Sequence, residues 1–235
     1  LDGLSSYSLK AHPMPAALKI DFVSDVSCPW CVIGLAALDQ ALEKVKYDIT
    51  AEIHFQPFEL NPKMAPEGQE ITEHITQKYG ISVDQANANR ENIRARGEAL
   101  GFRFAMAADA GGGRSRIYNT FDAHRLLYWA ETVSLSKQKA LKQALFTAYF
   151  THGQSPGAHS TLVAAATTAG LDAGQAEAVL SSGQYAAEVR KQEEFYRSQG
   201  INSVPAVIIN NKHLISGGQP PEVFEQALRQ IAAGD

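Results

Sequence analysis

Hydrophobic and polar positions alternate early in the chain and soon afterwards follow a helical period. Residues 18–22 place Leu, Ile and Phe in alternation with Lys and Asp, which is the two-residue period of a β-strand. Apolar residues then recur at helical spacing through residues 35–45. Residues 49–56 alternate again, so we expect a second strand with one face exposed to water.

The middle of the chain carries a different pattern. Pro57, Pro62 and Pro66 break regular structure after the second strand. From residue 70 to residue 198 no strand pattern is present, and glycines separate stretches of helical period. We expect helices at residues 70–79, 83–100, 118–132, 136–151, 160–169, 172–181 and 185–198.

Strand patterns return near the end of the sequence. Ala206 to Ile209 is a continuous apolar run, as expected of a strand that is covered on both faces. Asn210-Asn211 is a turn signal, and a short strand is expected at His213 to Ser216. Pro220-Pro221 then opens a final helix.

This order of elements predicts an α/β protein whose sheet is interrupted by a helical insertion. The first and last segments would form one domain, from residues 14–62 and 184–235. Residues 63–183 would form the inserted helical domain.

The only two cysteines of the chain lie in the tetrapeptide Cys28-Pro29-Trp30-Cys31, where the first strand should turn into the first helix. Pro29 suits the first helical turn because it has no N–H group to leave unpaired. At a helix N-terminus the free backbone N–H groups and the helix dipole favour a thiolate, so we expect Cys28 to be the attacking group. Cys31 would lie one turn further in, against the core, and would resolve a mixed disulfide at Cys28.

Two other interpretations of the cysteine pair are weaker. A structural disulfide gains little from so short a loop, and such bonds belong mostly to oxidising compartments. A zinc site usually needs four ligands, but no second cysteine pair or close histidine pair is present. We therefore predict a redox pair and no metal site.

Composition and net charge limit the kinds of molecule that the protein is expected to bind. The chain has 235 residues, of which 45% are hydrophobic and 20% charged, an ordinary globular composition. A net charge of -4 gives no reason to expect nucleic acid or an anionic membrane as partner, and no apolar run is long enough to cross a bilayer. Leu1 to Pro15 has no apolar signal region, so we expect a cytoplasmic protein, with Met14 as a candidate natural start.

Four segments together carry a resemblance to a known family. They are Ser24 to Gly34 around the cysteine pair, Tyr118 to Arg125, Val204-Pro205-Ala206, and Ser216 to Gln219. With the order of elements, they resemble the thioredoxin fold, and specifically the FrnE-like branch of the DsbA family. The resemblance implies a thioredoxin-like fold with a large all-helical insertion.

The resemblance also implies roles for individual residues. Val204-Pro205 would form a cis peptide beside the cysteine pair, and the Val204 backbone would pair with an extended substrate. Pro29 and Trp30 would support the two cysteines. Ser27, Asn119, His124 and Arg125 would bind substrate, the last three from the insertion.

One departure from the family concerns proton transfer. Thioredoxins and DsbA proteins carry a buried acid about six positions before the first cysteine, where this chain has Phe22. Asp25, Glu52 or a water molecule would then move the proton of Cys31.

The resemblance leaves three functions open. The first is a thiol-disulfide oxidoreductase that exchanges electrons with protein thiols or disulfides, with no tightly bound cofactor and with glutathione as a co-substrate. The second is a glutathione-dependent isomerase or transferase, like 2-hydroxychromene-2-carboxylate isomerase and the kappa-class glutathione transferases. Those families typically have serine at the position of Cys28, which argues against them here. The third is a non-catalytic client-binding or redox-sensing module, and any of the three is compatible with a homodimer.

Overall fold

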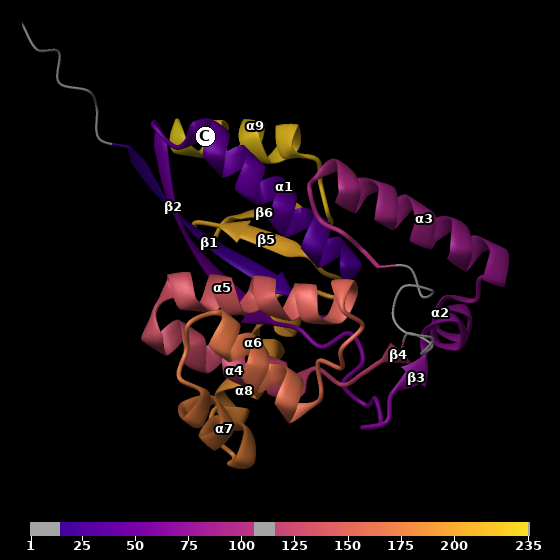
Figure 1. Cartoon of the computed structure of the whole chain (residues 1–235). Helices are drawn as coiled ribbons and strands as arrows, with labels where there is room; N and C mark the ends of the chain where they lie inside the picture. Colours follow the sequence, from indigo (N-terminus) through magenta and orange to yellow (C-terminus); the bar gives the residue numbers. More distant parts are fainter. Residues whose placement is uncertain (1–14, 106–115, 235) are drawn as a thin grey trace, which may run out of the picture.

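A four-stranded sheet forms the centre of the protein. The computed structural model describes residues 15–105 and 116–234, so Met14 lies outside the described residues. The strand order is β2-β1-β5-β6, and α1 and α9 lie along one side of the sheet (Figure 1). These strands are β1 (Ala16–Ser24), β2 (Ile49–Pro57), β5 (Ala206–Ile209) and β6 (His213–Ser216).

The pairing of the strands brings the two ends of the sequence together. β1 runs parallel to β2, with Ile20 opposite Ile53, and antiparallel to β5, with Ile20 opposite Ile209. The hairpin from β5 to β6 turns at Asn210 and Asn211, whose φ angles are 52° and 57°. Asparagine tolerates this left-handed region, so the predicted turn is confirmed.

Helices α1 (Pro29–Val45) and α9 (Pro221–Ala232) pack together beside the sheet, and each has proline in its first turn. The side chains of both helices and of the sheet form one apolar core cluster. Cys28 and Cys31 are members of this cluster. The cysteine pair is therefore anchored in the main core of the protein.

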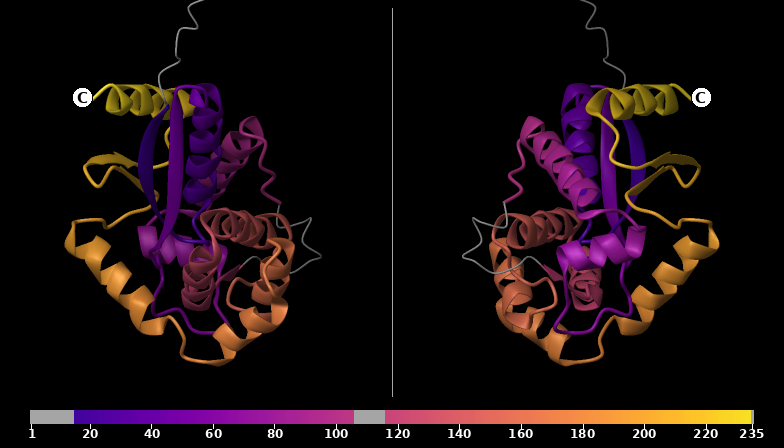
Figure 2. Two further views of the ribbon diagram at one scale, coloured as in Figure 1. Left: turned by 90° about the vertical axis from the view of Figure 1, so that its left-hand side faces the viewer. Right: turned by 90° about the vertical axis from the view of Figure 1, so that its right-hand side faces the viewer.

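The inserted segment is helical, as the sequence predicts. Helices α4 to α7 enclose an apolar cluster of their own, and α8 leads from them back to β5 (Figure 2). The helices of the inserted segment and its flank are α2 (Ile71–Tyr79), α3 (Val83–Ala99), α4 (Phe121–Val133), α5 (Leu135–Phe146), α6 (His159–Thr168), α7 (Ala173–Ser181) and α8 (Ala186–Ser198). The domain limits drawn from the sequence stay a prediction.

Three details differ from the sequence prediction. The helix expected from residue 118 begins at Phe121, because the Asn119 side chain accepts the Phe121 N–H at 2.9 Å and turns the chain before the helix. The helix expected to reach residue 151 changes to a π-helical turn, η1 (Thr147–Thr151). A two-residue ribbon pairs β3 (Gln69–Glu70) with β4 (Arg116–Ile117), and strands so short leave no periodic pattern.

The predicted fold class is confirmed: the protein combines an α/β sheet core with a helical insertion. Within the part of the chain that the structure describes, no helix has the length and apolar character needed to span a bilayer.

Candidate redox site

Cys28 lies at the N-cap of α1, with the extended backbone angles φ -95° and ψ 113°. Its sulfur is 3.6 Å from the Val204 carbonyl oxygen, and 3% of the residue is exposed. Cys31 follows one turn later and is fully buried. Both thiols are free, which is the reduced state of the pair. The positions predicted for the two cysteines, at the helix start and in the core, are confirmed.

The buried position of Cys31 controls its ionisation. Burial raises the pKa of the Cys31 thiol well above its ordinary value, and the neighbouring Cys28 thiol raises this pKa further. The Lys142 ammonium group and a backbone hydrogen bond from Asp25 oppose the rise in the pKa of Cys31. Cys31 is therefore a protonated, protected thiol until a partner sulfur reaches Cys28.

The loop that carries Val204 and Pro205 packs closely against α1. The Val204-Pro205 peptide bond is cis. A Cβ atom added at Gly34 would lie 3.0 Å from Cγ of Pro205, so only glycine leaves ordinary room at this position of α1. A Cβ atom at Gly218 would likewise lie 3.0 Å from the Trp30 carbonyl oxygen. Two loops distant in sequence thus meet at the first turns of α1.

Helices α2 and α3 supply side chains that the sequence did not mark as part of the site. The Arg96 guanidinium lies over the Trp30 ring, 5.3 Å from its centroid. On α2, burial raises the pKa of the Tyr79 hydroxyl, and the negative charge of Cys28 raises it further. Burial lowers the pKa of Lys78, against the opposing charges of Asp25 and Cys28. Helix α2 therefore lies within electrostatic range of the Cys28 sulfur, and α3 contacts the Trp30 ring between the two cysteines. Only the folding of the chain brings these helices there.

The loop before Cys28 is fastened by a buried carboxylate. Asp25 accepts hydrogen bonds from the backbone N–H groups of Ser27 at 3.1 Å and Leu60 at 2.7 Å. His124 Nε2 lies 3.8 Å from the same carboxylate. Burial alone would raise the pKa of Asp25, but the neighbouring His124 and the two backbone N–H groups together lower it. Asp25 therefore stays ionised and holds the redox loop in place.

The sequence matches the DSBA-like thioredoxin domain over residues 19–229. The chain belongs to this family of DsbA-like thioredoxin-domain proteins. The predicted membership of the DsbA family is thus confirmed.

Solved structures agree with the assignment to the DsbA-like family. A probable DsbA oxidoreductase, SCO1869 of Streptomyces coelicolor, is 34% identical with a TM-score of 0.83, over 93% of this chain and 91% of that one. The cytosolic disulfide reductase DsbM of Pseudomonas aeruginosa with GSH has a TM-score of 0.63 at 16% identity, over 92% and 99% of the two chains. A 2-hydroxychromene-2-carboxylate isomerase has a TM-score of 0.62 at 15% identity, over 91% and 95%. The last two share the fold.

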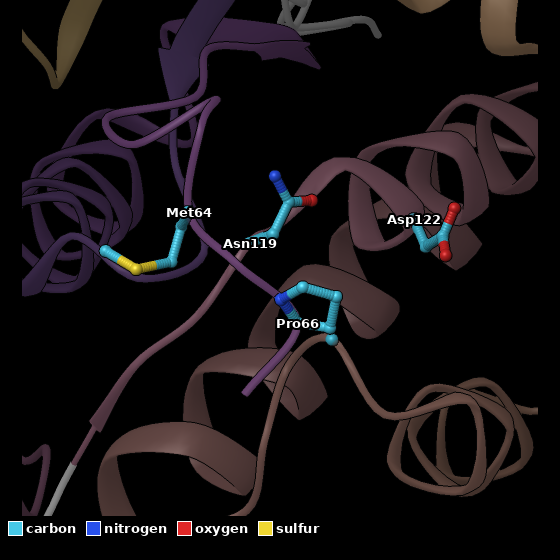
Figure 3. Close-up of a pocket in the computed structure, with 5 residues that line it drawn as sticks. Met64, Pro66, Asn119 and Asp122 are labelled. Atoms are coloured by element: carbon cyan, nitrogen blue, oxygen red, sulfur yellow. The ribbon is translucent and has the colours of Figure 1, made fainter. Parts of the chain in front are cut away.

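Three of the side chains that were predicted to bind substrate differ in how far they are buried in this DsbA-like protein. Ser27 is buried, and its hydroxyl has no hydrogen-bond partner among the described residues. His124 is buried beneath the redox loop, so it supports Asp25 and does not face solvent. Asn119 donates to Glu59 at 3.2 Å and lines a pocket of about 190 Å³ with Met64, Pro66, Asp122 and Gly157 (Figure 3).

Arg125 is placed differently from its prediction. Its guanidinium donates to the carbonyl oxygens of Val179, Ser182 and Gln184, and it pairs with Asp122 at 2.8 Å. These partners satisfy the end of α7 and the chain that follows it. The structure therefore gives Arg125 a role inside the helical insertion in place of the substrate-binding role expected from the sequence.

The position of the family's buried acid is apolar here. Phe22 is fully buried and packs edge to face against Phe55, with ring centroids 5.7 Å apart. Glu52 is exposed on β2, whereas Cys31 is fully buried, so Glu52 is not placed to exchange a proton with Cys31. Asp25 already uses both carboxylate oxygens on backbone N–H groups. Asp25 and a water molecule stay the predicted carriers of the proton.

Proposed function

We propose that this DsbA-like protein is a thiol-disulfide oxidoreductase that acts through Cys28 and Cys31. The observation that carries the proposal is the pair itself: Cys28 at the N-terminus of α1, with the buried thiol of Cys31 one turn behind it. The 34% identity to a probable DsbA oxidoreductase over nearly the whole chain supports this activity.

In the reducing direction, Cys28 attacks a client disulfide as a thiolate, after its proton has passed to water. A bond forms between Cys28 and one client sulfur, the client S–S bond breaks, and the second client sulfur leaves as a thiolate. Cys31 then attacks Cys28 Sγ and releases the first client sulfur. The client gains two electrons, and the protein becomes the Cys28-Cys31 disulfide.

We propose protein disulfides and thiols as clients and glutathione as the co-substrate that returns the protein to its dithiol form. Two glutathione molecules would supply the two electrons and leave as glutathione disulfide. The Val204 carbonyl lies 3.6 Å from Cys28 Sγ, and in this proposal it accepts a hydrogen bond from an extended client backbone. DsbM, which shares the fold, is a cytosolic disulfide reductase, and this supports the cytoplasm as the proposed compartment.

A glutathione-dependent isomerase is the alternative, because the fold is shared with 2-hydroxychromene-2-carboxylate isomerase. In that function Cys28 would steady a glutathione thiolate and would form no disulfide. A serine at position 28 would then retain activity. The two functions thus predict opposite results for one substitution.

The test is the equilibrium between the dithiol and disulfide forms in glutathione buffers, measured together with insulin reduction. We expect a reversible two-electron couple in the wild type and no insulin reduction in Cys28→Ser. Cys31→Ser should accumulate a mixed disulfide between Cys28 and glutathione, detectable by mass spectrometry. A protein with no redox couple, whose Cys28→Ser form isomerises 2-hydroxychromene-2-carboxylate with glutathione, would instead establish the alternative.

A further inference from the structure

A lysine side chain is completely buried against the core cluster that contains the redox pair. Lys142 lies on α5 and has no exposed surface. Its Nζ atom has no hydrogen-bond partner among the described residues. The ammonium group lies 5.0 Å from the centroid of the Phe146 ring and 6.0 Å from that of Phe55. Both rings belong to the core cluster that contains Cys28 and Cys31.

A buried ammonium group without a hydrogen-bonded partner is costly, and proteins rarely keep one without a use. The cation–π contacts with the two phenylalanine rings compensate for only part of the hydration that the ammonium group loses on burial. Two acids on helices that contact α5 already have other partners: Glu131 pairs with His54 at 2.7 Å, and Asp39 pairs with Lys139 at 2.6 Å. Lys142 therefore needs a different explanation from an ordinary ion pair.

The groups whose charges act on Lys142 are those of the redox site. Burial lowers the pKa of Lys142 to about 8, while the negative charges of Cys31, Asp25 and Cys28 act in the opposite direction. In return, the Lys142 charge counteracts the rise in the pKa of Cys31. Asp25 accepts two backbone N–H groups and lies 3.8 Å from His124 Nε2, and its lowered pKa keeps it a carboxylate at neutral pH. Of the three groups that act on Lys142, the two thiols are those that gain and lose charge during disulfide exchange.

We propose that Lys142 is the positioning residue of the resolving step, because its buried ammonium group stabilises the Cys31 thiolate that attacks the mixed disulfide at Cys28. This inference rests on the proposed oxidoreductase function. The positive charge comes from the helical insertion and lies by the ring of Phe55. Another neighbour of that ring is Phe22, which takes the place of the family's buried acid.

The resolving step balances with Lys142 protonated throughout. The Cys31 thiol releases its proton to water, and its sulfur forms a bond to Cys28 Sγ. The bond between Cys28 and the client sulfur breaks, and its electron pair leaves on the client as a thiolate, which takes up a proton from water. Lys142 compensates the negative charge while it resides on Cys31.

The test compares Lys142→Met with the wild type and with Lys139→Met, a lysine on the same helix that is partly exposed. In Cys28→Ser protein, the Cys31 thiolate is titrated by its ultraviolet absorbance, with and without Lys142→Met. Because the pKa of Lys142 is about 8, its charge acts only on the low-pH part of this titration, and we expect loss of Lys142 to move that part upward by about one pH unit. Lys139→Met should leave it in place.

The second measurement is the pH profile of mixed-disulfide resolution in otherwise wild-type protein. When the pKa of Cys31 rises by one unit, about tenfold less thiolate is present at pH 7, but each thiolate is a stronger nucleophile. We therefore expect resolution of the mixed disulfide at pH 7 to slow about threefold for each unit of pKa. The profile of Lys142→Met should also shift to higher pH. A merely structural role would lower the rate without moving the profile.

The outcomes separate the two proposals. If the Cys31 titration shifts in Lys142→Met but the wild type exchanges no disulfides, the proposed function is overturned. The charge coupling between Lys142 and Cys31 would still be established. Normal disulfide exchange with an unshifted titration and an unshifted pH profile in Lys142→Met would overturn the role of Lys142.

Discussion

At the scale of single residues, Lys142 is maintained at the expense of stability. The folded protein holds an ammonium group away from water with no hydrogen bond among the described residues, whereas the unfolded chain hydrates it. Replacing such a group by an apolar side chain of similar length is often neutral or stabilising. Lys142 therefore resembles a functional group more than a structural one.

The effect of Lys142 on stability should depend on pH in a defined direction. Its pKa is lowered to about 8 in the folded protein, against about 10.4 for an exposed lysine. Between these values the unfolded chain binds more protons, so the Lys142 contribution makes the wild type more stable as the pH rises. We expect Lys142→Met to be more stable than the wild type at pH 7, by about 1 to 3 kcal/mol.

The advantage of Lys142→Met should shrink by about 1 kcal/mol between pH 7 and pH 9, as measured by urea unfolding of the reduced proteins. Lys139→Met should differ from the wild type by no more than about 1 kcal/mol at either pH, because Lys139 is a partly exposed ion-pair residue. A Lys142→Met protein less stable than the wild type at both pH values would contradict this account.

At the scale of elements, the first turns of α1 are where separate segments converge. The strand-to-helix junction positions Cys28, the loop before β5 brings Pro205, and the loop after β6 brings Gly218 against Trp30. Only small residues at the contact points allow such close approach of a loop to a helix. The geometry of the redox site thus depends on residues that carry no reactive group.

Gly34→Ala should separate stability from activity. The added methyl group gains about 1 kcal/mol of helix propensity but overpacks against Pro205 at a cost of about 1 to 3 kcal/mol. We expect the free energy of unfolding to fall by no more than about 2 kcal/mol. Insulin reduction should fall by about tenfold, because Pro205 must shift beside Cys28.

Gly183→Ala is the matched control, since a Cβ atom there meets nothing within 4 Å. It should leave insulin reduction unchanged. If Gly34→Ala were as active as this control, the close packing of Pro205 on α1 would be irrelevant to the reaction.

At the scale of the whole molecule, one glutamine side chain of the insertion pairs with the backbone of the sheet's edge strand, as a neighbouring strand would. Gln138 of α5 is fully buried. It accepts the Phe55 N–H at 3.0 Å and donates to the Phe55 carbonyl at 3.1 Å. One glutamine thus satisfies both backbone groups of a residue on the edge strand β2.

Gln138→Ala should weaken the whole protein, because it leaves both buried backbone groups of Phe55 without partners. We expect a loss of about 2 to 4 kcal/mol in the free energy of unfolding, measured by urea denaturation. Gln143→Ala removes an exposed glutamine from the same helix and should cost about 0.5 kcal/mol or less. Equal effects of the two substitutions would show that the Gln138 bridge does not stabilise the union of insertion and sheet.

Much of the fold follows from local patterns in the sequence. Periodicity predicts the order of strands and helices, because each element buries one face or one stripe whatever its neighbours are. The prolines and the asparagine pair predict the helix start at residue 221 and the turn at residues 210–211. The Cys28-Pro29-Trp30-Cys31 motif at a strand-to-helix junction predicts both the cysteine at the helix N-terminus and the buried cysteine one turn on.

The tertiary structure alone decided which polar side chains belong to the redox site. Helix α5 carries Lys137, Lys139 and Lys142, and the sequence offers little to distinguish the one that is buried. Arg125 and His124 are adjacent on α4, yet one binds carbonyls at the end of α7 and the other lies beneath the redox loop. The physical reason is that periodicity fixes which residues share a face of a helix, whereas the charges and backbone groups that this face meets come from segments far away in the chain.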